Sequence, residues 1–296
     1  MTNSSPGLTS HDGVELNGCA NIVVADADRI RTITIDRPEA KGAMRGEMWS
    51  ALGNALADAQ DNREVAVVVL TGTGDAFCAG VDLTEMAEIA MGTGAADAHA
   101  FPRLADTMST FSKPLLVAVN GIGVGFGATV LGFADLAFMA STARIKCPFT
   151  RLGVAPELAS SFTFPALIGR QNASWALLSS EWLDAEECQR MGLVFRVCDP
   201  DELLAVTMEH ARVLATKPIS SLVESKRTIL AGMAPQIAAA RQSEDEAFQR
   251  LLGPPENPEA RLLYTSPSPT DRTRARMPAF ALKKKPLYKH NCRDNS

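Results

Sequence analysis

Apolar and polar positions along this chain alternate between two periods. Short β-branched runs at residues 65–71 and 115–119 predict buried strands. Residues 45–60 instead carry apolar side chains every three or four positions, which predicts an amphipathic helix. In the first half of the chain such runs follow one another as strand, strand, helix. The pattern predicts an α/β fold of repeated ββα units.

The same periodicity predicts the other elements. Strands are expected at residues 21–25, 31–36, 136–140 and 194–197, and helices at residues 97–111, 184–191, 201–215, 220–231 and 236–252. The last three helices follow one another without a strand-like run between them. We therefore expect a sheet-containing core over residues 21–216 and a helical segment over residues 217–263.

Two glycine-rich segments follow strand-like runs. Residues 74–86 read G-D-A-F-C-A-G-V-D-L-T-E-M, and residues 120–129 read N-G-I-G-V-G-F-G-A-T. Each leads into a stretch able to open a helix, where main-chain N–H groups are unpaired, and glycine lets a ligand approach the backbone closely. A tight turn explains either segment alone equally well. Together they indicate two N–H donors for an oxygen that becomes negative during a reaction, an oxyanion hole.

A dinucleotide site is the main alternative for the second segment. Its glycines at 121, 123, 125 and 127 are spaced G-x-G-x-G-x-G, whereas the dinucleotide fingerprint is G-x-G-x-x-G. A phosphate-binding G-K-[ST] motif does not follow either segment. The spacing thus argues against nucleotide binding.

Both segments, together with R-P-E-A-K-G-A at residues 37–43, resemble the motifs of the crotonase, or enoyl-CoA hydratase/isomerase, superfamily. The resemblance covers about residues 20–255. It implies a crotonase-like spiral of ββα units, with the main-chain N–H groups of Val81 and Phe126 as donors to the thioester oxygen of an acyl-CoA. No separate cofactor is implied, because CoA is part of the substrate. The resemblance also implies that residues 217–263 pack a homotrimer, or a hexamer of two trimers.

The acid and base groups vary within this superfamily. Members resembling the hydratases carry two glutamates, and here Thr129 and Phe149 stand at those positions. Neither side chain can move a proton at neutral pH. Residues 148–165 resemble instead the Δ3,Δ2-enoyl-CoA isomerases, whose single glutamate base corresponds to Glu157. The resemblance therefore implies a double-bond isomerase of fatty acid oxidation.

One carboxylate suffices for that reaction, since it can take a proton from C2 and return it at C4 on the same face. Burial of Glu157 among Phe149, Phe162 and Phe164 would raise its pKa towards the working pH. A solvated loop carboxylate is the alternative for Glu157. Hydratase-like or other crotonase chemistry, and a non-catalytic acyl-CoA-binding or RNA-binding relative, also stay open.

A second group of residues is expected to bind the CoA part. Arg37 and Lys41 would meet its phosphates, because the family uses basic side chains beside this turn and the ligand carries several negative charges. Simple solvation of Lys41 is equally compatible with the sequence. The remaining expected CoA-binding residues are Ala43, Ala79, Asp82 and Leu83. For Asp82 we favour a helix cap, which satisfies free N–H groups.

Composition narrows the class of protein further. The chain has 296 residues, 46% of them hydrophobic, and a formal net charge of -5. Six cysteines without a C-x-x-C pair and four scattered histidines predict no metal site and a reducing compartment. We expect the cytoplasm in a bacterium, or a peroxisome or mitochondrion in a eukaryote. No apolar run is long enough for a membrane span, and residues 1–20 are expected to form a loose arm.

Residues 264–296 differ abruptly in composition from the rest. They hold eight Lys or Arg against two Asp, which leaves 21 basic and 32 acidic residues in the remainder. The segment resembles translated read-through, and we expect it to be disordered. The acidic remainder opposes attraction to nucleic acid, so neither nucleic acid nor a membrane is an expected partner.

Overall fold

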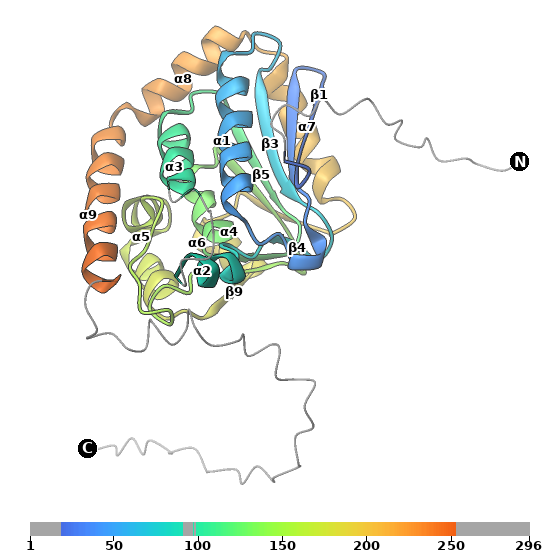
Figure 1. Cartoon of the computed structure of the whole chain (residues 1–296). Coiled ribbons are helices and arrows are strands. Elements are labelled where there is room, and N and C mark those ends of the chain that lie inside the picture. Colours follow the sequence, from blue (N-terminus) through green and yellow to red (C-terminus); the bar gives the residue numbers. More distant parts are fainter. Residues whose placement is uncertain (1–18, 91–96, 98, 253–296) are drawn as a thin grey trace, which may run out of the picture.

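The computed structural model describes residues 19–90, 97 and 99–252 (Figure 1). The expected loose arm, apart from its last two residues, and the expected disordered tail lie outside these residues. The described chain is an α/β fold with two sheets. The class and the succession of ββα units predicted from the sequence are confirmed.

The larger sheet has six strands. Its order is β1 (Ile22–Ala27), β2 (Ile30–Ile35), β3 (Val67–Gly72), β5 (Leu115–Val119), β7 (Leu136–Ala140) and β10 (Arg196–Cys198). Only β1 and β2 pair antiparallel in this sheet, as a hairpin, and the remaining neighbours are parallel. The central strands β3 and β5 are almost continuously apolar and buried, as a sheet covered on both faces requires.

Four shorter strands form a second sheet in the order β4 (Ala76–Cys78), β6 (Ile122–Val124), β8 (Arg144–Lys146) and β9 (Trp182–Asp184). The chain visits the two sheets alternately: β3 leads to β4, β5 to β6, and β7 to β8. Each step along the large sheet is thus repeated in the small one, which gives a spiral. Our sequence prediction missed these strands, because three residues are too few to show a period.

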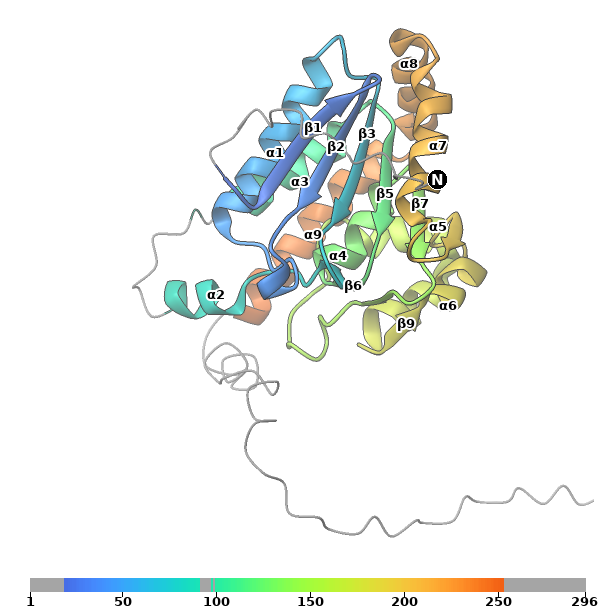
Figure 2. The ribbon, with the colours of Figure 1, turned by 90° about the vertical axis from the view of Figure 1, so that its right-hand side faces the viewer.

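Helices cover both faces of the large sheet (Figure 2). On one face lie α1 (Gly46–Asp61) and α3 (Ala100–Thr110), which pack on each other, and on the other lies α7 (Leu203–Ala215). The predicted amphipathic stripe of α1 is buried, with Met48, Leu52 and Leu56 at 2% exposure or less. Burial of this stripe fixes α1 against the sheet.

The remaining helices lie around the small sheet and at the C-terminal end. They are α2 (Leu83–Ala90), α4 (Phe126–Thr129), α5 (Ser160–Leu178), α6 (Ala185–Met191), α8 (Ile219–Ala231) and α9 (Ala234–Leu252), with 3-10 turns η1 (Pro38–Ala40) and η2 (Val130–Phe133). The residues A-S-S-F-T-F that begin two residues after Glu157 predict the start of a short apolar helix. In the structure the helical residues extend to Leu178, but Gly169, with φ of +74°, is not helical, so α5 consists of two helical stretches joined at a kink.

The helices expected after residue 201 are confirmed as α7, α8 and α9. Figure 1 shows α9 running beside α5, and residues of the two helices are in contact. The C-terminal helix thus lies against the segment that follows Glu157. Among the described helices, none combines the length and the apolar character that a bilayer span requires.

Candidate active site

The two glycine-rich segments meet at one edge of the small sheet. Strands β4 and β6 are parallel neighbours, with Ala76 paired to Ile122 and Cys78 to Gly123. Because parallel strands end at the same edge, the residues that follow them lie close together. Val81 and Phe126 therefore follow these short strands, and not directly the longer strands β3 and β5 that the sequence indicated.

Two glycines permit this close approach. A Cβ at Gly80 would lie 2.7 Å from the carbonyl oxygen of Val124, and the φ of Gly80 is +83°. A Cβ at Gly127 would lie 2.2 Å from the carbonyl oxygen of Cys78. Neither position has room for a side chain. The backbone of the first segment is thus packed directly on the backbone of the second.

The main-chain directions at Val81 and Phe126 suit outward-pointing donors. Met44 forms a parallel bridge to Val81 by donating to Gly80 O (2.7 Å) and accepting from Asp82 N (2.9 Å). The N–H of Val81 itself then points away from Met44. Phe126 is the first residue of α4, where N–H groups precede the first intrahelical acceptor. Their use as an oxyanion hole remains a prediction.

An aromatic cluster fixes the start of α4. The ring of Phe126 packs edge-to-face on Trp49, with centroids 5.0 Å apart, and on Phe101 at 6.3 Å. Trp49 and Phe101 are themselves in contact at 5.1 Å. Such pairs add to the burial energy of large side chains. The Phe126 side chain is therefore an anchor in the core, and only its backbone can serve a ligand.

Asn120 joins the two segments through its side chain. Its Nδ2 donates to the carbonyl oxygens of Gly74 and Ala76, both at 3.0 Å, and its Oδ1 accepts from Gly72 N at 3.0 Å. A side-chain amide has both donors and an acceptor, which these three contacts need. Asn120 is the first residue of the second glycine-rich segment, but the sequence predicted no role for its side chain. In the structure its hydrogen bonds hold the two segments together.

Glu157 lies against the second segment. Its Oε1 accepts a hydrogen bond of 2.7 Å from the hydroxyl of Thr129, three residues after Phe126. Its Oε2 is buried and has no hydrogen-bond partner in the described part of the chain. Glu157 as a whole is partly exposed, but this carboxylate oxygen is shielded from water, which argues against a solvated loop carboxylate. A buried carboxylate oxygen without a partner is costly, and such groups are enriched at functional sites.

Burial raises the pKa of Glu157 from 4.5 to about 8, the hydrogen bond from Thr129 lowers it, and the negative charge of Glu244 raises it. The thiols of Cys78 on β4 and Cys147 after β8 also lie close enough to feel the Glu157 charge. Burial raises the pKa of Cys78 to about 12 and raises that of Cys147 as well. These thiols are neutral neighbours, and the predicted upward shift of the Glu157 pKa is confirmed.

Most residues expected to bind CoA lie on two adjacent backbone segments. Residues 41–44 run beside residues 79–82, joined by a bond of 3.0 Å from Ala79 N to Lys41 O. The Lys41 side chain is exposed, with Nζ 4.0 Å from Asp75 Oδ2, while Ala43 and Ala79 are partly buried. Lys41 therefore presents a cation at the edge of the site, and its contact with CoA phosphates remains a prediction.

Arg37 and Asp82 are engaged with each other. Arg37 Nη1 donates to Asp82 Oδ2 at 2.6 Å and to Ala43 O at 2.8 Å, and its side chain is only 16% exposed. Asp82 Oδ1 accepts from the N–H groups of Thr84 and Glu85, so the helix cap is confirmed. Burial opposes ionisation of Asp82, yet the Arg37 and main-chain hydrogen bonds hold its pKa below the ordinary value.

The ion pair with Asp82 favours a structural role for Arg37 over a role in binding the CoA phosphates, because the guanidinium already donates to acceptors within the protein. Leu83, the next residue, is 45% exposed and keeps a free apolar surface beside Val81. Among the expected CoA-binding residues, Lys41 and Leu83 are thus the ones whose side chains face outward.

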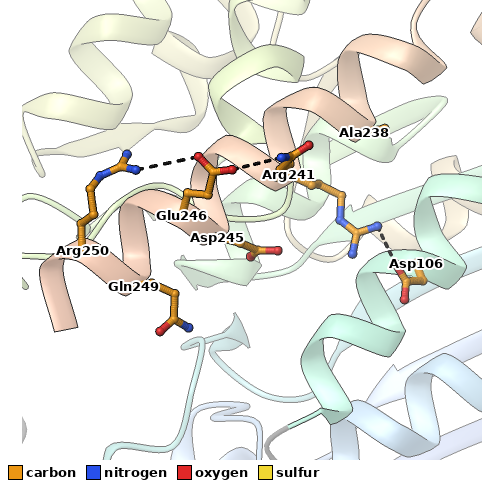
Figure 3. Close-up of a pocket in the computed structure, with 8 residues that line it drawn as sticks. Asp106, Ala238, Arg241, Asp245, Glu246, Gln249 and Arg250 are labelled. Atoms are coloured by element: carbon orange, nitrogen blue, oxygen red, sulfur yellow. Dashed lines mark hydrogen bonds and ion pairs between the residues drawn. The ribbon is translucent and has the colours of Figure 1, made fainter. Parts of the chain in front are cut away.

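A hollow of about 730 Å³ lies elsewhere, between α3 and α9 (Figure 3). It is lined mainly by charged side chains, among which Arg241 pairs with Asp106 at 2.7 Å and Glu246 with Arg250 at 3.9 Å. None of the residues expected to bind the thioester lines it. Arg241 and Asp106 pair across the two helices, whereas Glu246 and Arg250 lie one turn apart on α9. The hollow is thus separate from the candidate reaction site. No cluster of His, Cys, Asp or Glu suited to a metal ion occurs within the described ranges.

Known proteins place the chain in a family. The family model described as enoyl-CoA hydratase/isomerase matches residues 26–265. The chain belongs to this family. The crotonase-like spiral is therefore confirmed, and the protein is an acyl-CoA-processing enzyme of the crotonase superfamily.

Three similar proteins illustrate the range of the family. A solved structure named enoyl-CoA hydratase EchA8_6 from Mycobacterium marinum is 52% identical, with a TM-score of 0.69, and covers 72% of this chain and 100% of its own. The 2,3-dehydroadipyl-CoA hydratase of Escherichia coli is 30% identical over 91% of this chain and 99% of its own length. The enoyl-CoA delta isomerase 2 of Rattus norvegicus is 31% identical over 81% of this chain and 62% of its own length.

Two side chains that form hydrogen bonds to Glu157 or to the turn after it were not found by sequence reasoning. The sequence analysis treated Thr129 only as the residue that replaces a glutamate of the hydratases. Its position three residues after Phe126 could have suggested a contact with Glu157. Glu244 lies on α9, more than 80 residues from the amides it binds, and no local pattern singles it out. Such contacts between distant segments arise only when the chain is folded.

Proposed function

We propose that the protein is a Δ3,Δ2-enoyl-CoA isomerase, which moves a carbon–carbon double bond from C3–C4 to C2–C3 of an acyl-CoA. The observation that carries the proposal is the buried Glu157 carboxyl, with one unpartnered oxygen and a pKa raised to about 8. Thr129 occupies the place of a second glutamate and donates to Glu157. The site thus offers one strong proton carrier beside two outward-directed main-chain amides.

The chemistry follows from this arrangement. The ionised Glu157 takes a proton from C2, and the electron pair left behind is delocalised onto the thioester oxygen as an enolate. The N–H groups of Val81 and Phe126 stabilise that oxygen, each by about 3 kcal/mol. The protonated Glu157 then returns its proton at C4 as the double bond forms between C2 and C3. No proton, electron or water is consumed overall.

The raised pKa suits both halves of this cycle. A carboxylate that accepts a proton poorly would not remove one from C2, and one that held it too strongly would not return it. A pKa near the working pH balances the two steps. The apolar burial that produces the shift therefore has a functional consequence.

Water addition is the alternative, because two of the three relatives described above are named hydratases. A hydratase mechanism with two glutamates needs one carboxyl to activate water and another to protonate carbon. Thr129 cannot ionise near neutral pH, and Phe149 has no polar atom. The composition of the site thus favours isomerisation, and one assay can test both reactions.

The test uses a 3-enoyl-CoA and follows the absorbance of the conjugated 2-enoyl thioester. We expect turnover by the wild-type protein and a loss of roughly a hundredfold or more in kcat for Glu157→Gln. The matched control Glu64→Gln changes an exposed glutamate and should keep full activity. Water addition to a 2-enoyl-CoA is measured in parallel. Isomerisation at wild-type rate in Glu157→Gln, or hydration without isomerisation, would overturn the proposal.

We also propose an oligomeric state and a cellular compartment for the protein. We expect a homotrimer, alone or paired as a hexamer, packed through residues 217–263, which sedimentation velocity can measure. The cysteines at positions 19, 78, 147, 188 and 198 are free thiols, as in a reducing compartment such as the bacterial cytoplasm.

A further inference from the structure

Glu244 on α9 is a buried carboxylate with unusual partners. Glu244 is only 5% exposed. Its Oε2 accepts from the main-chain N–H of Ala159 at 2.7 Å, and its Oε1 accepts from that of Ser161 at 2.8 Å. Both oxygens of the carboxylate are thus used on the backbone of a segment more than 80 residues away.

The two amides belong to the turn that carries Glu157 into α5. Leu158 and Ala159 both have positive φ, at 55° and 52°, a conformation that residues other than glycine rarely adopt. The Ser160 N–H and hydroxyl close the turn onto the carbonyl oxygen of Glu157, at 3.1 and 2.6 Å. A backbone in this conformation persists only where its surroundings hold it.

We propose that Glu244 is a positioning residue, through which the C-terminal helix holds the strained Glu157–Ala159 turn and directs the Glu157 carboxyl into the reaction site. The inference rests on the proposed role of Glu157. It assigns α9 a part in catalysis besides packing. Glu244 of this helix binds the Glu157 turn, while other residues of the same helix line the α3–α9 hollow (Figure 3).

A purely structural helix cap would make the same two hydrogen bonds, so the charge of Glu244 must be tested. Glu157 faces Thr129 from α4, neutral Cys78 from β4, neutral Cys147 after β8, and Glu244 from α9. Burial raises the pKa of Glu244, while its hydrogen bonds from Ser161 and Ala159 favour the ionised form. In that form Glu244 is the anion of this set. Removing the charge of Glu244 should therefore lower the pKa of Glu157. If Glu244 acted only as a hydrogen-bond acceptor for the turn, its replacement would leave the pKa of Glu157 unchanged.

The experiment compares Glu244→Gln with Glu246→Gln on the same helix. Glu246 lines the hollow and is largely exposed, so its replacement removes an equal charge away from the turn. In Glu244→Gln we expect kcat for the 3-enoyl-CoA to fall roughly tenfold to a hundredfold, with KM little changed. The rising limb of kcat/KM against pH should move to lower pH. Glu246→Gln should match the wild type in both.

Hydrogen–deuterium exchange provides a readout that does not need activity. In the wild type, the amides of Ala159 and Ser161 should be protected, and in Glu244→Gln a peptide spanning residues 157–163 should exchange faster. Unprotected amides in the wild type would overturn the inference even if the variant did not fold. So would a Glu244→Gln variant with unchanged exchange and an unmoved pH profile. If the wild type does not isomerise, the proposed function fails, while the exchange result still decides the role of Glu244.

Discussion

Opposing effects on one side chain define the chemistry at the residue scale. Burial and the charge of Glu244 raise the pKa of Glu157, while the Thr129 hydroxyl lowers it. The motif containing Glu157 was visible in the sequence, but its burial and its two polar neighbours were not. Arg37 is the reverse case, since its charge suggested a phosphate ligand and folding pairs it with Asp82.

Replacing Glu157 by Gln should stabilise the protein in a pH-dependent way. The folded-state pKa of about 8 lies above the ordinary value of 4.5, so the favourable contribution of protonated Glu157 is complete below about pH 4.5. It is lost as the pH rises to about 8, by about 1.4 kcal/mol for each pH unit. Glutamine does not titrate and avoids this loss.

Thermal unfolding at pH 5 and pH 9 measures the difference between wild type and Glu157→Gln. We expect nearly equal melting temperatures at pH 5 and a clearly higher one for the variant at pH 9. Equal melting temperatures at both values would show that Glu157 is not buried with a raised pKa.

Thr129→Val should move the activity profile in the direction opposite to Glu244→Gln. Valine keeps the shape of threonine but cannot donate to Glu157, so the pKa of Glu157 should rise further. We expect the rising limb of kcat/KM to shift to higher pH by roughly one unit. The control Thr129→Ser keeps a hydroxyl and should stay close to the wild type. An unmoved limb in Thr129→Val would contradict a tuning role for this bond.

The elements that the sequence predicted well share one property, which is length. Strands β1, β2, β3, β5 and β7 of the large sheet and the helices α1, α6, α7, α8 and α9 have enough residues for a hydrophobic period to appear. Strand β10 is an exception, because it has three residues and the sequence still predicted a strand at residues 194–197. The strands β4, β6, β8 and β9 have three residues each and take their conformation from pairing with one another. The predicted donors follow two of these short strands, so the site's architecture was the part hardest to foresee.

Helix α8 is attached to the large sheet through an ion pair whose cation, Lys226, is buried and whose anion, Asp135, is partly exposed. Lys226 Nζ donates to Asp135 Oδ2 at 2.7 Å and to the carbonyl oxygen of Lys113 at 2.9 Å, and the same Asp135 oxygen accepts from Leu115 N. Lys226 is 6% exposed. These contacts connect the C-terminal helices to the start of β5 and the turn before β7.

We expect Lys226→Met to lower the free energy of unfolding by about 1–3 kcal/mol, because Asp135 and the carbonyl oxygen of Lys113 would lose a hydrogen-bond donor. Arg227→Met is the matched control, since Arg227 pairs with Glu224 at the surface and both are well exposed. Its effect should stay within about 0.5 kcal/mol. Urea denaturation measures both variants. Equal stability of the two would show that the ion pair of Lys226 does not hold α8.

For the whole molecule, alternation between two sheets is the feature that creates the site. Three successive strand pairs, β3 with β4, β5 with β6 and β7 with β8, contribute one strand to each sheet. Loops about 45 residues apart in the chain, after β4 and β6, therefore become neighbours. Glu157 reaches them from a third unit, and α9 supports Glu157 from outside the spiral. Four separate parts of the chain therefore contribute to one site.

The sequence by itself determined the α/β class, the succession of ββα units, the family and the glutamate able to carry a proton, because hydrophobic period and short motifs are local properties. The tertiary structure alone decided that Glu157 is buried beside Thr129, that Arg37 is paired with Asp82, and that Glu244 binds the Glu157 turn. These depend on which distant segments pack together, and it is packing that sets the desolvation and the hydrogen-bond partners of each charge.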